Sequence, residues 1–267
     1  MRLSLGFTLA WLGLVALLPL FALIRRGAGL SWADAASTLA DPRVHAAFGL
    51  SFGAAAAAAA VNAVFGLIVA WVLVRHDFVG RRVIDALVDL PFALPTAVAG
   101  IALTAVWSEN GVLGAPLARL GVKVAYTPLG IGVALVFIGL PFVVRTLQPV
   151  IEDLDRDVEE AASTLGAKPL VIFRRVVFPE LVPALATGTV LAFARGLGEY
   201  GSVVFISGNM PMRTEILPLL IVTKLEQYDY AGATVLAVAM LAASALLLLA
   251  LNGLTRWQRR FVHGGEA

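Results

Sequence analysis

The sequence predicts an all-α, polytopic membrane protein that forms a single transmembrane domain over residues 1–267. Hydrophobic residues make up 60% of the chain and charged residues only 14%, with a mean hydropathy of +0.89. Soluble domains do not have this composition. Runs of about twenty apolar residues, enough to cross roughly 30 Å of hydrocarbon, recur along the chain. Six transmembrane helices are expected from these runs, near Leu5 to Ile24, Ala47 to Val74, Val83 to Trp107, Thr127 to Val150, Leu181 to Ile206 and Tyr230 to Leu254.

The first two runs differ in character. Leu5 to Ile24 is of full spanning length, and Leu23-Ile24-Arg25 contains no small-residue cleavage site, so it is interpreted as a retained anchor and not a signal peptide. The second run contains an unbroken alanine stretch, Ala54 to Ala60, which favours a closely packed interior helix. Asn62 follows it as a candidate hydrogen-bond partner between helices.

Prolines interrupt the third and fourth runs. Pro91 and Pro95 each remove a backbone donor and clash with the preceding turn, so a kink or an unwound segment is expected there. Pro141 is expected to act in the same way in the fourth run. Prolines are also common in membrane helices, so simple curvature is the alternative at Pro141, and a gating role for these prolines competes with it.

A strongly charged stretch separates the fourth and fifth runs, over residues 151–180. It opens with acids at Glu152, Asp153, Asp155, Asp157, Glu159 and Glu160, and its apolar residues Leu154, Val158, Ala161, Ala162 and Leu165 share one helical stripe. Gly166 suits a left-handed helix end and Pro169 suits the first turn of a second helix. Two short helices at an angle are therefore predicted. They either meet another protein at the membrane surface or form a solvated connection.

The fifth run carries charges at membrane depth. Arg195 and Glu199 are four residues apart, so they are expected to share a helical face. Each isolated charge costs about 2.5 to 3.5 kcal/mol there on insertion scales, which requires either pairing or a wet cavity. A structural ion pair and an anion pathway with Arg195 as its positive charge both remain open. Gly196, Gly198 and Gly201 would allow close helix approach or local unwinding.

Several activities are excluded by what the chain lacks. It has no cysteine, and His45, His76 and His263 are expected in separate loops or tails, so no metal site is predicted. The Gly166-Ala167-Lys168 sequence lacks the spacing of a phosphate-binding loop, so the chain is not predicted to be an ATPase. No bound cofactor, nucleic-acid partner or enzymatic activity is expected, and membrane lipid is the expected surrounding.

The distribution of lysine and arginine predicts the orientation. With the N-terminus inside, the inner segments hold twelve of these residues and the outer segments seven. Because cytoplasmic loops carry the excess, both termini and the acidic loop are expected in the cytoplasm.

The charged loop resembles a known sequence motif. Glu160-Ala161-Ala162, then Gly166 after three residues, then Val176-Val177-Phe178-Pro179, is similar to the EAA loop of ABC importer permeases, with Val176 and Phe178 as apolar departures. The resemblance implies that Glu160, Ala161, Ala162 and Gly166 form a coupling helix and turn. In that family the coupling helix docks into a cytoplasmic ATP-binding subunit.

Longer segments resemble the T-type permease subunits of sulfate/thiosulfate importers. They are Asp89 to Gly100, Ala125 to Gly130, Gly139 to Thr146, Gly198 to Ile206 and Leu225 to Ala233, and the likeness covers roughly residues 40 to 255. The resemblance implies a type I ABC importer permease fold in the bacterial inner membrane. The expected translocation pathway comprises Pro95, Thr96, Arg195, Glu199, Tyr200 and Ser202.

The same resemblance implies partners and a power source. These are a dimer of ATP-binding subunits that uses ATP and Mg, a similar W-type permease and a periplasmic sulfate-binding protein. A molybdate or tungstate permease is the alternative within the family. An ion-coupled secondary transporter is the alternative of another class, although Glu199 is the one clear acid well inside a predicted span. A membrane enzyme is disfavoured because no span contains histidine or cysteine.

Overall fold

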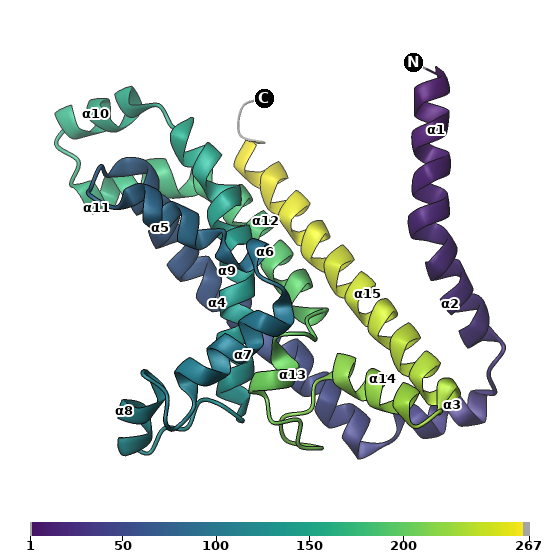
Figure 1. Ribbon diagram of the computed structural model, residues 1–267. Helices are drawn as coiled ribbons and strands as arrows, with labels where there is room; N and C mark the ends of the chain where they lie inside the picture. The colour runs from purple at the N-terminus through teal and green to yellow at the C-terminus, as the bar shows by residue number, and fades with distance from the viewer. Residues whose placement is uncertain (1, 264–267) are drawn as a thin grey trace.

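The computed structural model describes residues 2–263, and every regular element in that range is helical (Figure 1). Two short π-helical turns, η1 and η2, interrupt otherwise α-helical segments. The elements in chain order are α1 (Arg2–Leu12), η1 (Gly13–Leu17), α2 (Leu18–Ala28), α3 (Trp32–Leu39), α4 (Pro42–Arg75), α5 (Arg81–Val88), α6 (Leu90–Ala93), α7 (Thr96–Trp107), α8 (Gly114–Arg119), α9 (Pro128–Glu152), α10 (Arg156–Thr164), α11 (Pro169–Ile172), η2 (Phe173–Val177), α12 (Phe178–Leu197), α13 (Val203–Ile206), α14 (Leu217–Glu226) and α15 (Tyr230–His263).

Four helical stretches in the described chain are long and apolar enough to cross a membrane. They are α4, α9, the continuous stretch Pro169–Leu197, and Tyr230–Ala250 of α15. The segments Gly6–Val15 and Leu18–Ala28 pass the same test only as a pair, with a bend of 42° between them. The described residues therefore contain four continuous spans, or five with the bent pair, where the sequence predicts six.

The missing span is the proline-containing third run. It consists of α5, α6 and α7, and Leu94 between α6 and α7 has an extended backbone with φ −87° and ψ 135°. Pro95 precedes the first residue of α7. The expected unwinding is confirmed here, because a residue before proline avoids the helical region and proline cannot donate to the preceding turn.

Pro141 behaves differently from this expectation. The α9 helix continues through both Pro141 and Pro149 as far as Glu152, so the chain is not unwound at Pro141 and the alternative of helix curvature is left. Pro141 is buried within the helix bundle, where neighbouring helices hold the segment in place. Helix packing thus overrides the local proline signal.

The predicted limits of the fifth span are also wrong at both ends. The helix begins at Pro169, because α11, η2 and α12 run together, so the second short helix of the charged loop is the start of this span. It ends at Leu197, and Val203–Ile206 forms the separate helix α13. Gly198, with φ −87° and ψ 7°, is the C-cap of this helix, and the chain turns there before α13 begins.

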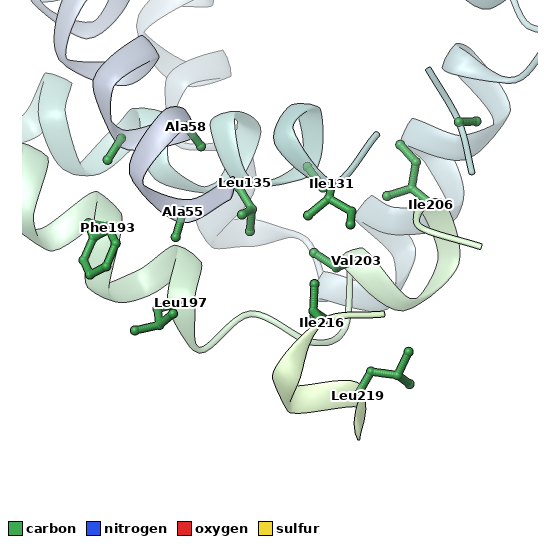
Figure 2. Close-up of a cluster of buried hydrophobic side chains, with 13 residues drawn as sticks. Ala55, Ala58, Ile131, Leu135, Phe193, Leu197, Val203, Ile206, Ile216 and Leu219 are labelled. Atoms are coloured by element: carbon green, nitrogen blue, oxygen red, sulfur yellow. The ribbon is translucent and has the colours of Figure 1, made fainter. Parts of the chain in front are cut away.

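The bundle core is formed by α4, α9 and α12, which pack against one another. Figure 2 shows Ala55 and Ala58 of α4 beside Leu135 of α9 and Phe193 of α12. The predicted close packing of the alanine stretch is confirmed for one face, where Ala55, Ala58 and Ala59 are buried. Small side chains on that face let the helix backbones approach.

The two ends of the bundle carry different elements. In Figure 1, α10 and α11 lie at one end, whereas α3, α8 and α14 lie at the opposite end. The purple helix α1 stands apart from the bundle, and α2 and α3 return the chain to α15.

Candidate functional site

The charged loop forms a capped helix with a defined turn after it. The Asp155 carboxylate accepts a hydrogen bond from the Asp157 backbone N–H at 2.9 Å, which caps the N-terminus of α10. Asp157 and Glu159 lie in its first turn, where the helix dipole favours negative charge.

The turn after α10 has the predicted left-handed glycine. Gly166 has φ +82°, its N–H donates to the Ser163 carbonyl at 2.9 Å, and the Ala167 N–H donates to the Ala162 carbonyl at 3.1 Å. This pair of bonds is the Schellman motif, which needs a left-handed residue at the position after the cap. Pro169 then takes the first turn of α11, as predicted.

Most of the apolar stripe of α10 is exposed. Val158 is 51% exposed and Leu165 is 89% exposed, and Glu160 and Ala161 are also exposed, whereas Ala162 is half-buried. Leu154, the first residue of the stripe, packs against a buried apolar cluster that includes Leu147 and Ile151, so the exposed part is Val158, Ala161 and Leu165. A surface with apolar and acidic side chains and a small alanine at its centre is therefore available to another protein.

Arg75, the last residue of α4, fastens α10 to the bundle. Its Nη2 lies 2.5 Å from Glu159 Oε1, and its guanidinium lies 5.1 Å from the centre of the Trp71 ring. Trp71 in turn meets Phe173 edge to face, with ring centres 5.5 Å apart. The sequence predictions missed this link, although an arginine four residues after a tryptophan at the end of an apolar run is a signal for it.

The predicted pair of Arg195 and Glu199 is present, but the two residues do not share one helix. Arg195 Nη1 lies 2.6 Å from Glu199 Oε2, but Glu199 lies beyond the end of α12 and not on it. The other carboxylate oxygen accepts hydrogen bonds from the Ser202 backbone N–H at 2.8 Å and the Ser202 hydroxyl at 3.0 Å. Glu199 is 2% exposed, whereas the Arg195 side chain is 34% exposed. The buried Glu199 carboxylate thus accepts the hydrogen bonds of the turn and pairs with the partly exposed Arg195 guanidinium.

The broken third run packs against this turn. A Cβ atom on Gly100 would lie 2.4 Å from the Ser202 carbonyl oxygen, and one on Gly201 would lie 2.1 Å from Thr96 Oγ1. Only glycine fits at such contacts. The structure therefore places Thr96 against Gly201 and Gly100 against Ser202, with Pro95 preceding α7 at the same junction. Tyr200 is half-buried and packs against the apolar cluster of Figure 2.

A second ionic cluster joins α9 to α5, and the sequence predictions missed it. Arg145 Nε lies 2.8 Å from Asp89 Oδ1 and its Nη2 lies 2.5 Å from Asp89 Oδ2. Its Nη1 lies 2.6 Å from Asp85 Oδ1, and Gln148 donates to the same Asp85 oxygen at 3.1 Å. The orientation count treats Arg145 as a loop residue, whereas it lies within α9.

A third ionic contact lies at the other end of α4. Arg43 forms a two-bond pair with Glu215, with Nε to Oε2 and Nη2 to Oε1 both at 2.7 Å. Glu215 is 3% exposed, and nearby the Ser51 hydroxyl accepts the Leu217 backbone N–H at 2.7 Å. These contacts fix the connection between α13 and α14 against α4. No pattern in the sequence predicts a role for Glu215.

No group of three or more metal-binding side chains with suitable geometry occurs between residues 2 and 263. His45 lies in the first turn of α4 and not in a loop as predicted. Asn62 is fully buried in α4, and neither atom of its amide finds a hydrogen-bond partner within the described residues. Its expected role as an interhelix hydrogen-bond partner is therefore wrong.

The sequence matches a known family over most of its length. The model of the family described as "Binding-protein-dependent transport system inner membrane component" matches residues 62–264. Among curated proteins, the chain is 50% identical over 261 residues to the sulfate transport system permease protein CysT of Salmonella typhimurium, covering 97% of this chain and 94% of that protein. It is 46% identical over 255 residues to the CysT protein of Synechococcus elongatus, covering 96% and 92%.

Solved structures share the fold at low sequence identity. A bacterial ABC transporter involved in the import of the acidic polysaccharide alginate matches with a TM-score of 0.78 at 14% identity, covering 96% of this chain and 94% of that one. The same transporter in complex with an alginate pentasaccharide-bound periplasmic protein matches with a TM-score of 0.78 at 15% identity, covering 96% and 93%. Such likeness establishes the helical architecture alone.

Proposed function

The chain belongs to the family of inner-membrane components of binding-protein-dependent transport systems, and from that premise we propose that it is the membrane-spanning subunit of an ATP-driven sulfate importer. Sulfate is proposed as the substrate because about half of the residues are identical, over nearly the full length, to those of sulfate permeases from two bacteria. Thiosulfate is proposed as a second substrate. The chain is a transport component and not an enzyme.

The proposed assembly contains further subunits. The exposed apolar and acidic face of α10, with Glu160, Ala161 and Ala162, would dock into an ATP-binding subunit, two of which use ATP and Mg. A second, W-type permease would complete the membrane part. A periplasmic sulfate-binding protein would deliver the anion, in keeping with the family's dependence on a binding protein.

The proposed orientation places α10 and both termini in the cytoplasm. This agrees with the excess of lysine and arginine on that side. Six crossings then require that α5, α6 and α7 together count as the third one. Their combined length and the packing of α7 against α13 within the bundle support this count.

The mechanism we propose is alternating access driven by ATP. Closure of the two ATP-binding subunits would displace α10, which lies between α9 and the start of the Pro169–Leu197 helix. The Arg75 pair with Glu159 connects the same helix to α4. A displacement of α10 would therefore reach all three core helices, because well-packed helices move as units.

The pathway we propose passes Arg195. Its side chain is 34% exposed, so a guanidinium group can present positive potential to a passing dianion. Glu199 holds the other side of the guanidinium and is itself fixed by Ser202. Pro95, Thr96, Tyr200 and Ser202 would shape the junction where α7 meets this turn.

The test is uptake of labelled sulfate in a strain that lacks this subunit, complemented with the wild-type gene, with molybdate as competitor. Restored uptake that molybdate does not reduce is the expected result. Strong inhibition by molybdate would instead favour the molybdate or tungstate alternative. Uptake that survives ATP depletion but stops when the proton gradient collapses would favour the secondary transporter.

A further inference from the structure

An apolar groove lies near the α10 end of the bundle, and several of its side chains, Val64 and Ile68 among them, are exposed. Its volume is about 420 Å³, and it lies between α4 and the start of the Pro169–Leu197 helix. All of its lining residues are apolar: Ala63, Val64, Leu67, Ile68, Trp71, Val72, Phe173, Phe178 and Leu185. It can therefore accept a hydrocarbon chain but no charged group.

The π-helical turn η2 builds one wall of the groove. The Phe178 N–H donates to the Phe173 carbonyl, a five-residue step in place of the four-residue step of an α-helix. Residues five apart would point in different directions on an α-helix, but a π-turn places them on one face. The rings of Phe173 and Phe178 accordingly lie 5.9 Å apart, and Trp71 meets Phe173 from α4.

Unpaired cations lie beside the same wall. Lys168, Arg174 and Arg175 are all exposed, and none of them forms an ion pair within the described chain. Arg174 directly follows the groove residue Phe173. By contrast, Arg75, Arg145 and Arg195 all have carboxylate partners. The positive charge next to the groove is thus available to an external anion.

We propose that this groove binds an anionic phospholipid, with an acyl chain against Trp71, Phe173 and Phe178 and the headgroup phosphate at Arg174 and Arg175. An apolar groove with uncompensated cations on one of its wall helices matches the two parts of such a lipid. Tryptophan at this level is typical of the membrane interface. The inference rests on the membrane embedding of the proposed function but not on sulfate as its substrate.

The site is connected to the α10 helix. Trp71 lines the groove on one side, and the Arg75 guanidinium lies 5.1 Å from the centre of its ring. Arg75 in turn pairs with Glu159 of α10. The Arg75 Nε atom is buried without a hydrogen-bond partner in the described chain, so Trp71 and Glu159 alone position this side chain. A lipid that immobilises Trp71 would therefore restrict the movement of α10.

The test is native mass spectrometry of the purified full chain with equal amounts of phosphatidylglycerol and phosphatidylcholine that carry identical acyl chains. Preferential retention of phosphatidylglycerol is expected. The double variant Arg174→Gln with Arg175→Gln should lower the ratio of bound phosphatidylglycerol to phosphatidylcholine by roughly tenfold or more. The matched control Arg82→Gln, an exposed arginine on α5 away from the groove, should leave the ratio unchanged.

Three outcomes would overturn the proposal. They are equal retention of both lipids by the wild type, an unchanged ratio in the double variant, and displacement of the lipid by glycerol phosphate without acyl chains. Retention of phosphatidylcholine and the melting temperature of the double variant show whether its fold is intact. Because no step measures sulfate, a failure here is distinguishable from a failure of the proposed transport function.

Discussion

Arg145 of α9 donates two parallel hydrogen bonds, of 2.8 and 2.5 Å, to Asp89, at the point where the third predicted span breaks. Asp89 separates α5 from α6, directly before the proline-containing segment that ends at Pro95. The pair therefore ties the helix that leads into α10 to the segment that packs on the Ser202 turn. In the proposed mechanism, a displacement of α10 would reach the broken span through α9 and this pair.

The first prediction concerns this pair. Arg145→Ala should reduce sulfate uptake strongly and lower the free energy of unfolding by about 1 to 2 kcal/mol, because Asp85 and Asp89 lose their shared cation while remaining partly exposed. Arg145→Lys keeps the charge but cannot form the two-bond geometry, so an intermediate defect is expected. Uptake per inserted protein and thermal unfolding in detergent measure the two effects. Wild-type uptake in Arg145→Ala would show that the pair of Arg145 and Asp89 does not contribute to transport.

Local features of this fold could be predicted from the sequence, whereas the ionic links could not. The left-handed Gly166, the first-turn position of Pro169 and the break before Pro95 each depend on a residue's own backbone limits. The Arg145 pair with Asp89 spans 56 residues and the Arg75 pair with Glu159 spans 84. Such contacts depend on which helices pack together, and the charge pattern does not determine that.

The outcome at Pro141 has the same physical origin. Pro141 does not interrupt α9 because the surrounding bundle holds the helix together. Within the predicted pathway, the spacing of Arg195 and Glu199 did predict their contact, since residues at that interval meet even where the helix has just ended. The role of Ser202 as the second partner of Glu199 required the turn itself.

The second prediction tests the coupling turn. Gly166→Pro should uncouple ATP hydrolysis from sulfate uptake, because proline cannot adopt the φ of +82° and lacks the N–H that bonds Ser163. Glu160→Lys should do the same by reversing an exposed charge on the docking face. Gly166→Asn is the matched control, since asparagine tolerates the left-handed region better than other side chains.

The measurements for this turn are ATP hydrolysis and sulfate uptake by the reconstituted complex. Both variants should insert normally and hydrolyse ATP with little uptake, and Gly166→Asn should retain most uptake. Full uptake in both Gly166→Pro and Glu160→Lys would remove α10 from the coupling mechanism.

The third prediction concerns the pair at membrane depth. Arg195→Ala should damage transport more than the double variant Arg195→Ala with Glu199→Ala, because it leaves a carboxylate that is 2% exposed without its cation. A cost of about 1 to 3 kcal/mol in stability is expected for the single variant, reduced by the partial exposure of Arg195. Sulfate uptake and melting temperature, measured across the four members of the double-mutant cycle, give the interaction between Arg195 and Glu199. Equal defects in the single and double variants would contradict mutual neutralisation.

The fourth prediction concerns pH at the start of α15. The Lys224 ammonium, 2.8 Å from Asp229, and the Gly232 N–H lower the pKa of the Asp229 carboxyl below its ordinary value of 3.8. A lowered folded pKa adds stability that is present above pH 3.8 and is lost as the pH falls through the folded value. Asp229→Asn retains the capping bond but not the charge. Between pH 7 and strongly acidic solution, its melting temperature should therefore fall less than that of the wild type. The corresponding difference in the free energy of unfolding should be under about 1 kcal/mol.

The Lys224→Met variant supplies the control for this effect. It removes the cation and should reproduce the weaker acid sensitivity of Asp229→Asn. Identical acid sensitivity in the wild type and both variants would show that the lowered pKa does not contribute to stability.

The last prediction concerns Asn62, which faces Gly139 of α9 so closely that a Cβ there would lie 2.4 Å from the Asn62 Nδ2 atom. Its amide is fully buried without partners in the described chain, and leaving such a group unpaired costs about 1 to 3 kcal/mol. Asn62→Leu keeps the branched outline of asparagine and has no polar atoms; leucine is the larger side chain, but removal of the unpaired amide should still raise the free energy of unfolding by about 1 kcal/mol. Gly139→Ala should destabilise the wild type but much less the Asn62→Ala background, where the clashing atom is absent. Thermal unfolding of the four variants measures both effects, and a lower melting temperature for Asn62→Leu would show that the amide is satisfied in the membrane.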